Sequence, residues 1–222
     1  MTNENYDPPE VEIYQLKIRL LKISPMIWRR VLVQSTMSIT RLHETIQCMM
    51  GWSDEHPHYF MIRGVEYGAN DDLNLPFLDN GYLISLKDFN FRLRERFLYE
   101  YDLRNRWQHE IRLEKRLDVR EGQIYPVCIG GGCATPPERC GGPERFMDLR
   151  WDNHPVDMIQ RMAEMMSALL EDREAPIDLD ELRETLYWYD IGKFDRQKAN
   201  QRLAARWIDQ SLSNVLAGEE SP

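Results

Sequence analysis

The sequence predicts an α+β fold, in which a β-grasp-like antiparallel or mixed sheet carries one helix and is covered by C-terminal helices. Three observations lead to this prediction. Apolar and polar residues alternate with a period of two through much of the first half, one helical pattern interrupts these strands, and the last third is helical in its periodicity. Short turns between the strand segments favour hairpins over a doubly wound sheet.

The stretch from residue 97 to 111, FLYEYDLRNRWQHEI, has the clearest strand pattern. Its arms alternate around a polar turn, with Tyr99 and Tyr101 in phase on the first and Trp107, His109 and Ile111 in phase on the second. This arrangement is typical of a half-buried hairpin. The residues that share the apolar phase of their elements are expected in the core: Trp107, Ile111, Leu113, Tyr14, Leu16, Ile18, Ile46 and Phe60.

The remaining elements of the first half follow from the same patterns. Gly51 is expected to end the helix, because glycine tolerates the left-handed conformation found there. In order, we expect a strand over 11–23, a strand over 27–33, a helix over 39–50, a strand over 58–63, a short strand over 65–67, an exposed loop over 70–81 and a short apolar segment over 83–87.

After the hairpin, residues 124–143 are so rich in glycine and proline that neither a helix nor a long strand is expected there. Helices are predicted from Pro155, over 179–186 and after Asp195. The apolar stripe of the first should pack on the sheet: Val156, Ile159, Met162 and Met166. The predicted organisation is a disordered tail over 1–10, a single domain over 11–212 with a sheet-rich part (11–150) and a helical part (151–212), and a frayed tail over 213–222.

Composition bounds the class of protein. With 42% hydrophobic and 29% charged residues, the chain has an ordinary globular composition. Its apolar runs fall short of the ~20 residues that span a bilayer, and its first residues are polar and acidic, so we expect a cytoplasmic protein without a membrane partner. The net charge of −9 does not favour nucleic-acid binding, although arginines gather between Arg92 and Arg116.

The glycine-rich segment also contains three of the four cysteines, Cys128, Cys133 and Cys140. In a reducing compartment such residues are thiols or metal ligands rather than disulfides. Because the loop bends freely, the three could converge on a structural zinc ion, with His109 as the fourth ligand of a closed Cys3His site. Their spacing is not that of a standard zinc ribbon. The alternative is that they are reduced thiols and that His109 packs against Trp107.

Other histidines offer weaker signals. His56 and His58 form an H-x-H pair whose side chains point the same way and can share a metal, but the alternation of His58 with Phe60 places it on the inner face of the strand. His43 lies beside the apolar stripe of the helix over 39–50 and is expected to be a packed histidine. The common phosphate-binding, nucleophile-elbow and zinc-protease motifs are missing, so no catalytic residue is predicted.

Several motifs together resemble the plasmid pRiA open-reading-frame-three-like family: SPMIWRRV, LHETIQCMMGW, HPHYFMIRG, FLYEYD with WQHEI, YPVCIGGGCATPPERCGGP and YDIGKFDRQKANQRLA. The match runs from about Val11 to Arg206. The resemblance implies a β-grasp-like α+β fold and an association with plasmids and insertion elements, without an assigned activity. Where the family's turn reads YD-x-GD-x-W-x-H, this chain has Arg104 in place of the glycine and Asn105 in place of the acid.

The leading interpretation is a non-enzymatic, cytoplasmic binding or interaction module with a protein partner, belonging to a mobile-element-associated family. The sheet and the acidic helices would form its partner surface. A metal-dependent enzyme that uses His56, His58, His109 or the cysteines is one alternative. A nucleic-acid-associated accessory protein that uses the arginine-rich hairpin is another. A resolvase-like role, as some family labels suggest, is disfavoured, because the sequence has neither a matching serine motif nor a basic helix-turn-helix.

Overall fold

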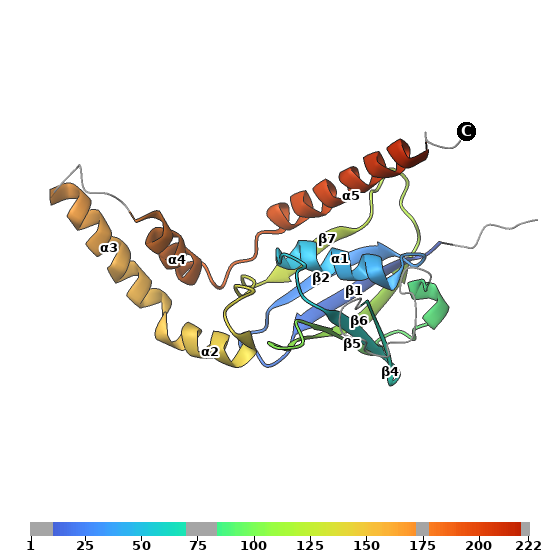
Figure 1. The fold of residues 1–222 in the computed structure, drawn as a ribbon, viewed down its shortest axis with the longest axis horizontal. Coiled ribbons are helices and arrows are strands. Elements are labelled where there is room, and N and C mark those ends of the chain that lie inside the picture. Colours follow the sequence, from blue (N-terminus) through green and yellow to red (C-terminus); the bar gives the residue numbers. More distant parts are fainter. Residues whose placement is uncertain (1–10, 70–83, 172–177, 219–222) are drawn as a thin grey trace, which may run out of the picture.

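The computed structural model describes residues 11–69, 84–171 and 178–218, which form one antiparallel sheet and a set of helices (Figure 1). The sheet has seven strands in the order β4-β3-β5-β6-β1-β2-β7. Its strands are β1 (Ile13–Leu20), β2 (Trp28–Gln34), β3 (His58–Ile62), β4 (Val65–Ala69), β5 (Arg96–Tyr101), β6 (Trp107–Leu117) and β7 (Val127–Gly132). The helices are α1 (Ile39–Met50), the 3-10 helix η1 (Leu86–Phe89), α2 (Gly142–Asp152), α3 (Pro155–Glu171), α4 (Leu179–Tyr189) and α5 (Arg196–Gly218). The α+β prediction is confirmed.

The predicted hairpin is formed by β5 and β6, with Tyr99 opposite His109 and Tyr101 opposite Trp107. The side chain of Asp102 closes its turn by accepting hydrogen bonds from the backbone N–H groups of Arg104 and Asn105. Strand β6 then pairs with β1, so the hairpin lies in the interior of the sheet rather than at an edge.

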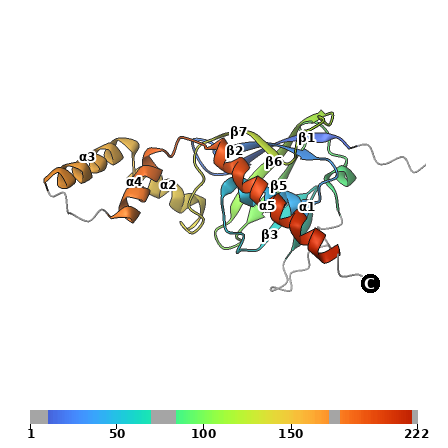
Figure 2. The same ribbon diagram turned by 90° about the horizontal axis from the view of Figure 1, so that it is seen from above.

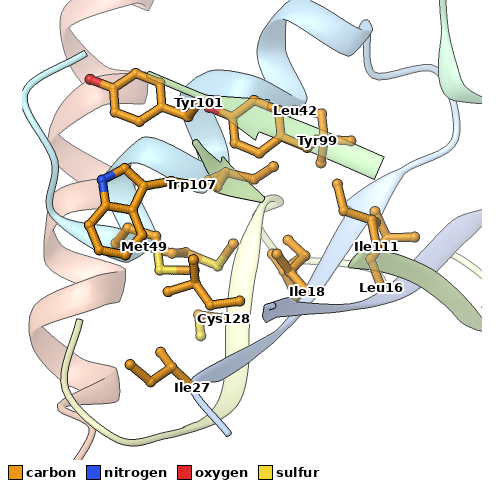
Figure 3. Close-up of a cluster of buried hydrophobic side chains, with 14 of the residues drawn as sticks. Leu16, Ile18, Ile27, Leu42, Met49, Tyr99, Tyr101, Trp107, Ile111 and Cys128 are labelled. Carbon is orange, nitrogen blue, oxygen red and sulfur yellow. The ribbon is translucent and has the colours of Figure 1, made fainter. Parts of the chain in front are cut away.

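The core lies between the sheet and α1. All eight residues predicted for the core are 0 or 1% exposed, which confirms the alternation argument. Helix α1 begins where Ser38 accepts a hydrogen bond from the N–H of Arg41, and it ends at Gly51, whose φ of 75° is left-handed. Its buried stripe packs against the aromatic and aliphatic side chains of β1, β5 and β6 (Figure 3).

The glycine-rich segment is more ordered than its composition predicted. It contains the six-residue edge strand β7, which pairs with β2, and it leads into α2 with a proline in the first turn. Gly131 is required by close approach, because a Cβ there would lie 2.3 Å from the ring of Phe194. Proline and glycine break internal strands, but an edge strand tolerates them, so the prediction missed both elements.

Strand β2 buries an arginine instead of its tryptophan. Arg29 is 1% exposed, while Trp28 lies on the opposite, partly exposed face. The Arg29 guanidinium donates to the carbonyl oxygens of Trp28 and Gly132 and to the hydroxyl of Thr135, and it lies 3.9 Å from the ring centroid of Phe194. Burial lowers the pKa of Arg29 to about 10, so the group stays charged at neutral pH.

Helix α5 covers part of the protein as predicted. It packs on α1 and β7, and Arg202 donates hydrogen bonds to the carbonyl oxygens of Cys48 and Met49 at the end of α1 (Figure 2). Asp195 precedes the helix and accepts from the N–H of Lys198, which agrees with the expected cap. The helix continues through Gly218, beyond residue 212 where the domain was expected to end.

Helices α2, α3 and α4 form a helical arm that extends away from the sheet (Figures 1 and 2). Helix α3 packs on α4, so the prediction that its stripe packs on the sheet is wrong. Val156, Ile159 and Met166 are 63%, 53% and 58% exposed, and Met158 is the buried residue instead. The prediction failed because α2 leads the chain outward before α3 begins.

Two expected segments, the tail over 1–10 and the loop over 70–81, lie outside the described residues, and the single-domain organisation stays a prediction. In place of the short apolar segment over 83–87, residues 86–89 form η1. Every helix in the described part of the chain is too short or too polar to cross a lipid bilayer.

The central position of Trp107 gives a test of the core. Trp107→Ala removes a fully buried ring and should lower the free energy of unfolding by about 3–5 kcal/mol. Trp151→Ala is the matched control, because Trp151 is 87% exposed and its loss should cost little. Urea denaturation measures both. Equal midpoints for the two variants would contradict the placement of Trp107.

Candidate metal centre

Two histidines singled out in the sequence, His43 and His58, lie next to one another beside α1. His43 comes from α1, His58 begins β3, and Asp54 lies in the segment that joins these elements. Tyr99 on β5 contacts His43 through its hydroxyl group. The elements bring the four together because β5 pairs with β3, while the buried face of α1 lies on both strands.

His43 is 3% exposed and uses both ring nitrogens. Its Nδ1 lies 2.8 Å from the hydroxyl of Tyr99, and its Nε2 lies 2.5 Å from Oδ1 of Asp54. Gln47 Nε2 donates to the same tyrosine oxygen, which leaves the phenol proton for Nδ1 and places the ring hydrogen on Nε2, facing Asp54. Burial raises the pKa of Tyr99 well above its usual value, so this residue acts as a neutral hydrogen-bonding group.

Asp54 stays ionised. Burial alone would raise its pKa, but the hydrogen bond and the electrostatic interaction with the His43 ring outweigh this effect and lower it. Its backbone has a φ of 63°, a left-handed conformation that few residues other than glycine adopt, although aspartate tolerates it better than most. The carboxylate is therefore held toward His43 by a constrained turn.

His58 stacks on His43, with ring centroids 3.4 Å apart and planes 3° from parallel. The pKa of His58 is lowered to about 3, chiefly by burial and further by His43. A neutral imidazole keeps a nitrogen lone pair at physiological pH, which is the form that binds metal.

One ligand atom from each of His43, Asp54 and His58 lies within 4.8 Å of the others, and among residues 11–69, 84–171 and 178–218 this is the one such group of three or more. Two imidazoles and a carboxylate suit zinc or non-haem iron and leave coordination positions open. The lone pair of an imidazole lies in the ring plane, so a metal cannot lie in both parallel planes. Metal binding therefore requires one ring to tilt.

A cavity of about 200 Å³ lies next to the end of α1, and Asp54 is the member of the group that lines it. Asp54 and Gln47 contribute to its lining, and Arg202 and Arg206 of α5 face them. Because the Asp54 side chain is 34% exposed, this cavity gives a small ion access to the Asp54 carboxylate.

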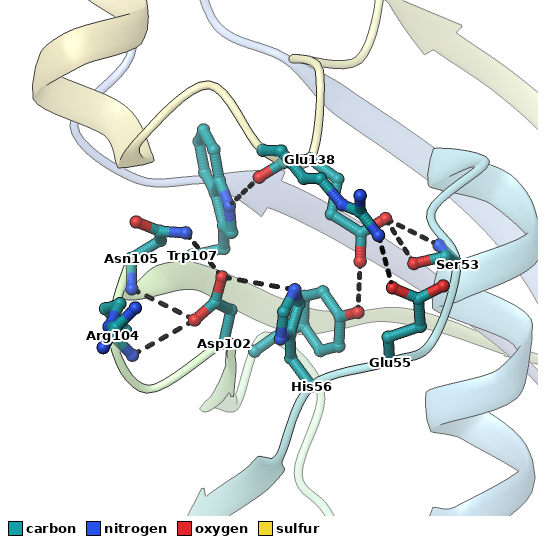
Figure 4. A network of polar contacts seen from close by, with 10 residues as sticks. Ser53, Glu55, His56, Asp102, Arg104, Asn105, Trp107 and Glu138 are labelled. Atoms are coloured by element: carbon teal, nitrogen blue, oxygen red, sulfur yellow. Dashed lines mark hydrogen bonds and ion pairs between the residues drawn. The ribbon is translucent and has the colours of Figure 1, made fainter.

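A hydrogen-bonded network anchors the segment that carries Asp54 (Figure 4). Glu138, from the glycine- and proline-rich loop, accepts from the backbone and the hydroxyl of Ser53, both at 2.8 Å, and also from the hydroxyl of Tyr101. On the other side, His56 Nε2 lies 3.8 Å from the carboxylate of Asp102. Loop and hairpin residues thus hold the Asp54 segment at both ends.

Comparison with known proteins identifies the family. A family model described as plasmid pRiA4b ORF-3-like protein matches residues 12–198. The chain belongs to this family. It is 28% identical over 207 residues to the uncharacterized protein y4hQ of Sinorhizobium fredii, a match that covers 88% of this chain and 94% of the relative. The crystal structure of MM3350 from Methanosarcina mazei Go1, titled a protein of unknown function, is 32% identical, with a TM-score of 0.60 over 85% of this chain and 97% of MM3350.

This ORF-3-like chain accommodates its unusual hairpin turn without strain at the substituted positions. The left-handed residues of the turn are Asp102 and Arg106, with φ of 56° and 55°, and Arg104 is not among them. Asn105 donates its amide hydrogen to Asp102 at 2.6 Å. An acid at position 105 could not donate this hydrogen bond while ionised, so the asparagine gives Asp102 a partner that the family's usual residue would not.

The structure does not bring the four predicted zinc ligands together. His109 is on β6 and Cys128 on β7, and with β1 and β2 between them the strands are about 14 Å apart. Cys128 lies in the apolar core (Figure 3) and donates weakly to the carbonyl of Gly130, while burial raises its pKa. Cys133 is buried and Cys140 half-buried, and all four cysteines are free thiols. A zinc ion on these residues stays a prediction without geometric support.

His109 occupies the core instead, in van der Waals surroundings that include the edge of Trp52. Its Nδ1 donates to the carbonyl of Trp107 at 3.0 Å, and its Nε2 is buried without a hydrogen-bond partner among the described residues. This matches the alternative reading of a packed histidine. His43 is buried, as expected, but the sequence did not predict its two hydrogen-bond partners, Tyr99 and Asp54.

The buried ring of His109 should make stability depend on pH. Burial lowers its folded-state pKa to about 3, whereas an unfolded histidine titrates near ~6.5. The unfolded chain therefore takes up a proton between these values that the folded chain does not. The contribution of neutral His109 to the free energy of unfolding is complete above about pH 6.5. It declines by about 1.4 kcal/mol per pH unit as the pH falls toward 3.

His109→Gln removes this titration and keeps a polar side chain of similar size. Urea denaturation between pH 4.5 and 6.5, a window above most carboxyl titrations, gives the free energy of unfolding as a function of pH. The slope for the variant should be smaller by about 1.4 kcal/mol per pH unit, which corresponds to the uptake of about one proton. Parallel slopes for the two proteins would contradict the neutral, buried state of His109.

Proposed function

We propose that this chain is a metal-binding module, which holds one divalent transition-metal ion with His43, Asp54 and His58. The proposal rests on one observation: a buried histidine, a neutral histidine and an ionised carboxylate place their ligand atoms within 4.8 Å of one another, and the carboxylate lines a cavity. The sequence predicts a binding module, and this proposal names a metal ion as what it binds.

The residues behind the three ligands support this role. When His43 binds a metal through Nε2, its Nδ1 must carry the hydrogen and donate it to Tyr99. Tyr99 then needs an acceptor for its own proton, and Oε1 of Gln47 is buried without a hydrogen-bond partner among the described residues. Reversing the amide of Gln47 supplies that acceptor, because the oxygen and nitrogen exchange places. His43, Tyr99 and Gln47 can therefore keep their hydrogen bonds to one another in both the empty and the occupied states.

A nucleic-acid role has less support in the structure. Arginines of the hairpin and its neighbours are paired with acids on the outer face of the sheet, where Glu110 contacts Arg19 and Arg96, and Glu114 contacts Arg30 and Arg112. The two glutamates offset half of the charge of these four arginines, which weakens the positive surface that would attract a phosphate backbone.

Metal titration of the full-length protein tests the proposal. Protein treated with a chelator and then dialysed should bind about one Zn²⁺ or Co²⁺ per chain by calorimetry. At about 100 times the dissociation constant, binding should add about 2.7 kcal/mol to the free energy of unfolding. His58→Ala and Asp54→Asn should abolish binding, because each removes one of three ligands.

His154→Ala is the matched control, since His154 is an exposed histidine on the helical arm, outside the group and outside the network that anchors Asp54, and this variant should bind normally. Cys133→Ser separates the cysteine hypothesis. If that variant loses the metal while His58→Ala keeps it, the ion belongs to the cysteine loop and the proposal is wrong. Wild-type protein that binds neither ion would also refute it. Circular dichroism confirms that each variant is folded.

A further inference from the structure

Helix α3 has two apolar stripes, and α4 covers only one of them. The covered stripe contains the fully buried Met158 and the partly exposed Met162, Met165 and Leu169. The second stripe is open. Val156, Ile159, Met166 and Leu170 are 63%, 53%, 58% and 73% exposed, and Ala163 between them is also exposed.

The open stripe has the spacing of a helix-pairing seam. Val156, Ile159, Ala163, Met166 and Leu170 follow one another at intervals of 3, 4, 3 and 4 residues. This is the a and d pattern of a heptad, in which residues of one helix insert between residues of another. An unpaired helix face of this size is unusual on a monomeric protein and marks an interaction site.

Charges around the seam indicate what kind of helix it accepts. The positions that flank a and d, which face a partner's own flanks, hold the uncharged residues Gln160, Met162, Ser167 and Leu169. The charged residues of α3 point away from the seam: Asp157, Arg161, Glu164 and Glu171. A partner selected by opposite charge would have nothing to pair with here, whereas an identical helix would meet no like charge.

Helix α4 extends the open surface. Leu179 and Leu186, two turns apart, are 57% and 44% exposed. Helix α4 also contacts α2 through Trp188 and Phe146, but within the described residues the arm has no third layer that buries the open faces of α3 and α4 (Figures 1 and 2). Two such helix pairs, packed face to face, form a four-helix bundle in which all the stripes are buried.

We propose that the open stripe of α3 is a homodimer interface, on which a second copy of this chain places the same stripe about a two-fold axis. Each helical arm then contributes α3 and α4 to one four-helix bundle. The sheet and the candidate metal centre lie outside this bundle, so dimerisation and metal binding are independent.

The oligomeric state of the full-length protein tests this proposal. Light scattering after size exclusion, or sedimentation velocity across the micromolar range, should report a dimer. The double variant I159E/M166E buries charges in the seam and should be monomeric with an unchanged circular dichroism spectrum. Ile124→Glu is the matched control. Ile124 is 80% exposed but lies outside the arm, so its variant should remain a dimer.

Cysteine cross-linking tests the interface without disrupting it. Ala163 is in the middle of the seam, so a two-fold axis brings it close to its own copy. Ala163→Cys should form a disulfide-linked dimer in mild oxidant. Ala168→Cys lies on the exposed side of the same helix, away from the seam, and should not. A monomeric wild-type protein, a double variant that stays dimeric, or equal cross-linking at the two positions would each overturn the proposal.

Discussion

The burial of one guanidinium constrains much of this structure. Arg29 faces the core at 1% exposure and has no carboxylate partner within the described part of the chain, so its charge must be solvated by carbonyl oxygens, a hydroxyl and an aromatic face. These groups come from the end of β7, from Thr135 and from Phe194 ahead of α5. A buried cation thus holds the edge strand, the glycine-rich loop and the start of the last helix in fixed positions, although they are far apart in the sequence.

The same loop then positions the candidate metal centre. The hydroxyl of Thr135 accepts a hydrogen bond from Arg29. Three residues later, Glu138 accepts hydrogen bonds from Ser53 and Tyr101. Asp54 follows Ser53 directly, so the ligand nearest to solvent is located by contacts that begin at the opposite edge of the sheet. The segment that the sequence marked as a metal loop because of its cysteines serves this site as a support, through a glutamate.

Local periodicity was sufficient for the parts of the fold in which one face is buried. It gave the hairpin, the ends of α1 and the core around Trp107, since alternation reports burial directly. It failed at β7, where Gly131 and Gly132 lie against the side chains of Phe194 and Trp28, and at α2, where Gly142 lies against the backbone of Asn105. It also failed for the site: Asp54 approaches His43 through a left-handed backbone conformation, and no sequence pattern encodes that approach.

Helix α1 receives its last hydrogen-bond donors from a residue made much later. Its terminal carbonyls at Cys48 and Met49 accept from Arg202, 154 and 153 positions further along the chain. At ribosomal speeds of about 5–20 residues per second, roughly 8 to 30 s separate the synthesis of these partners. Throughout that interval the helix that carries His43 lacks its final cap and the cover of α5. Contacts of such separation are closed late and at a high entropic cost, so the nascent chain exposes this apolar surface for many seconds.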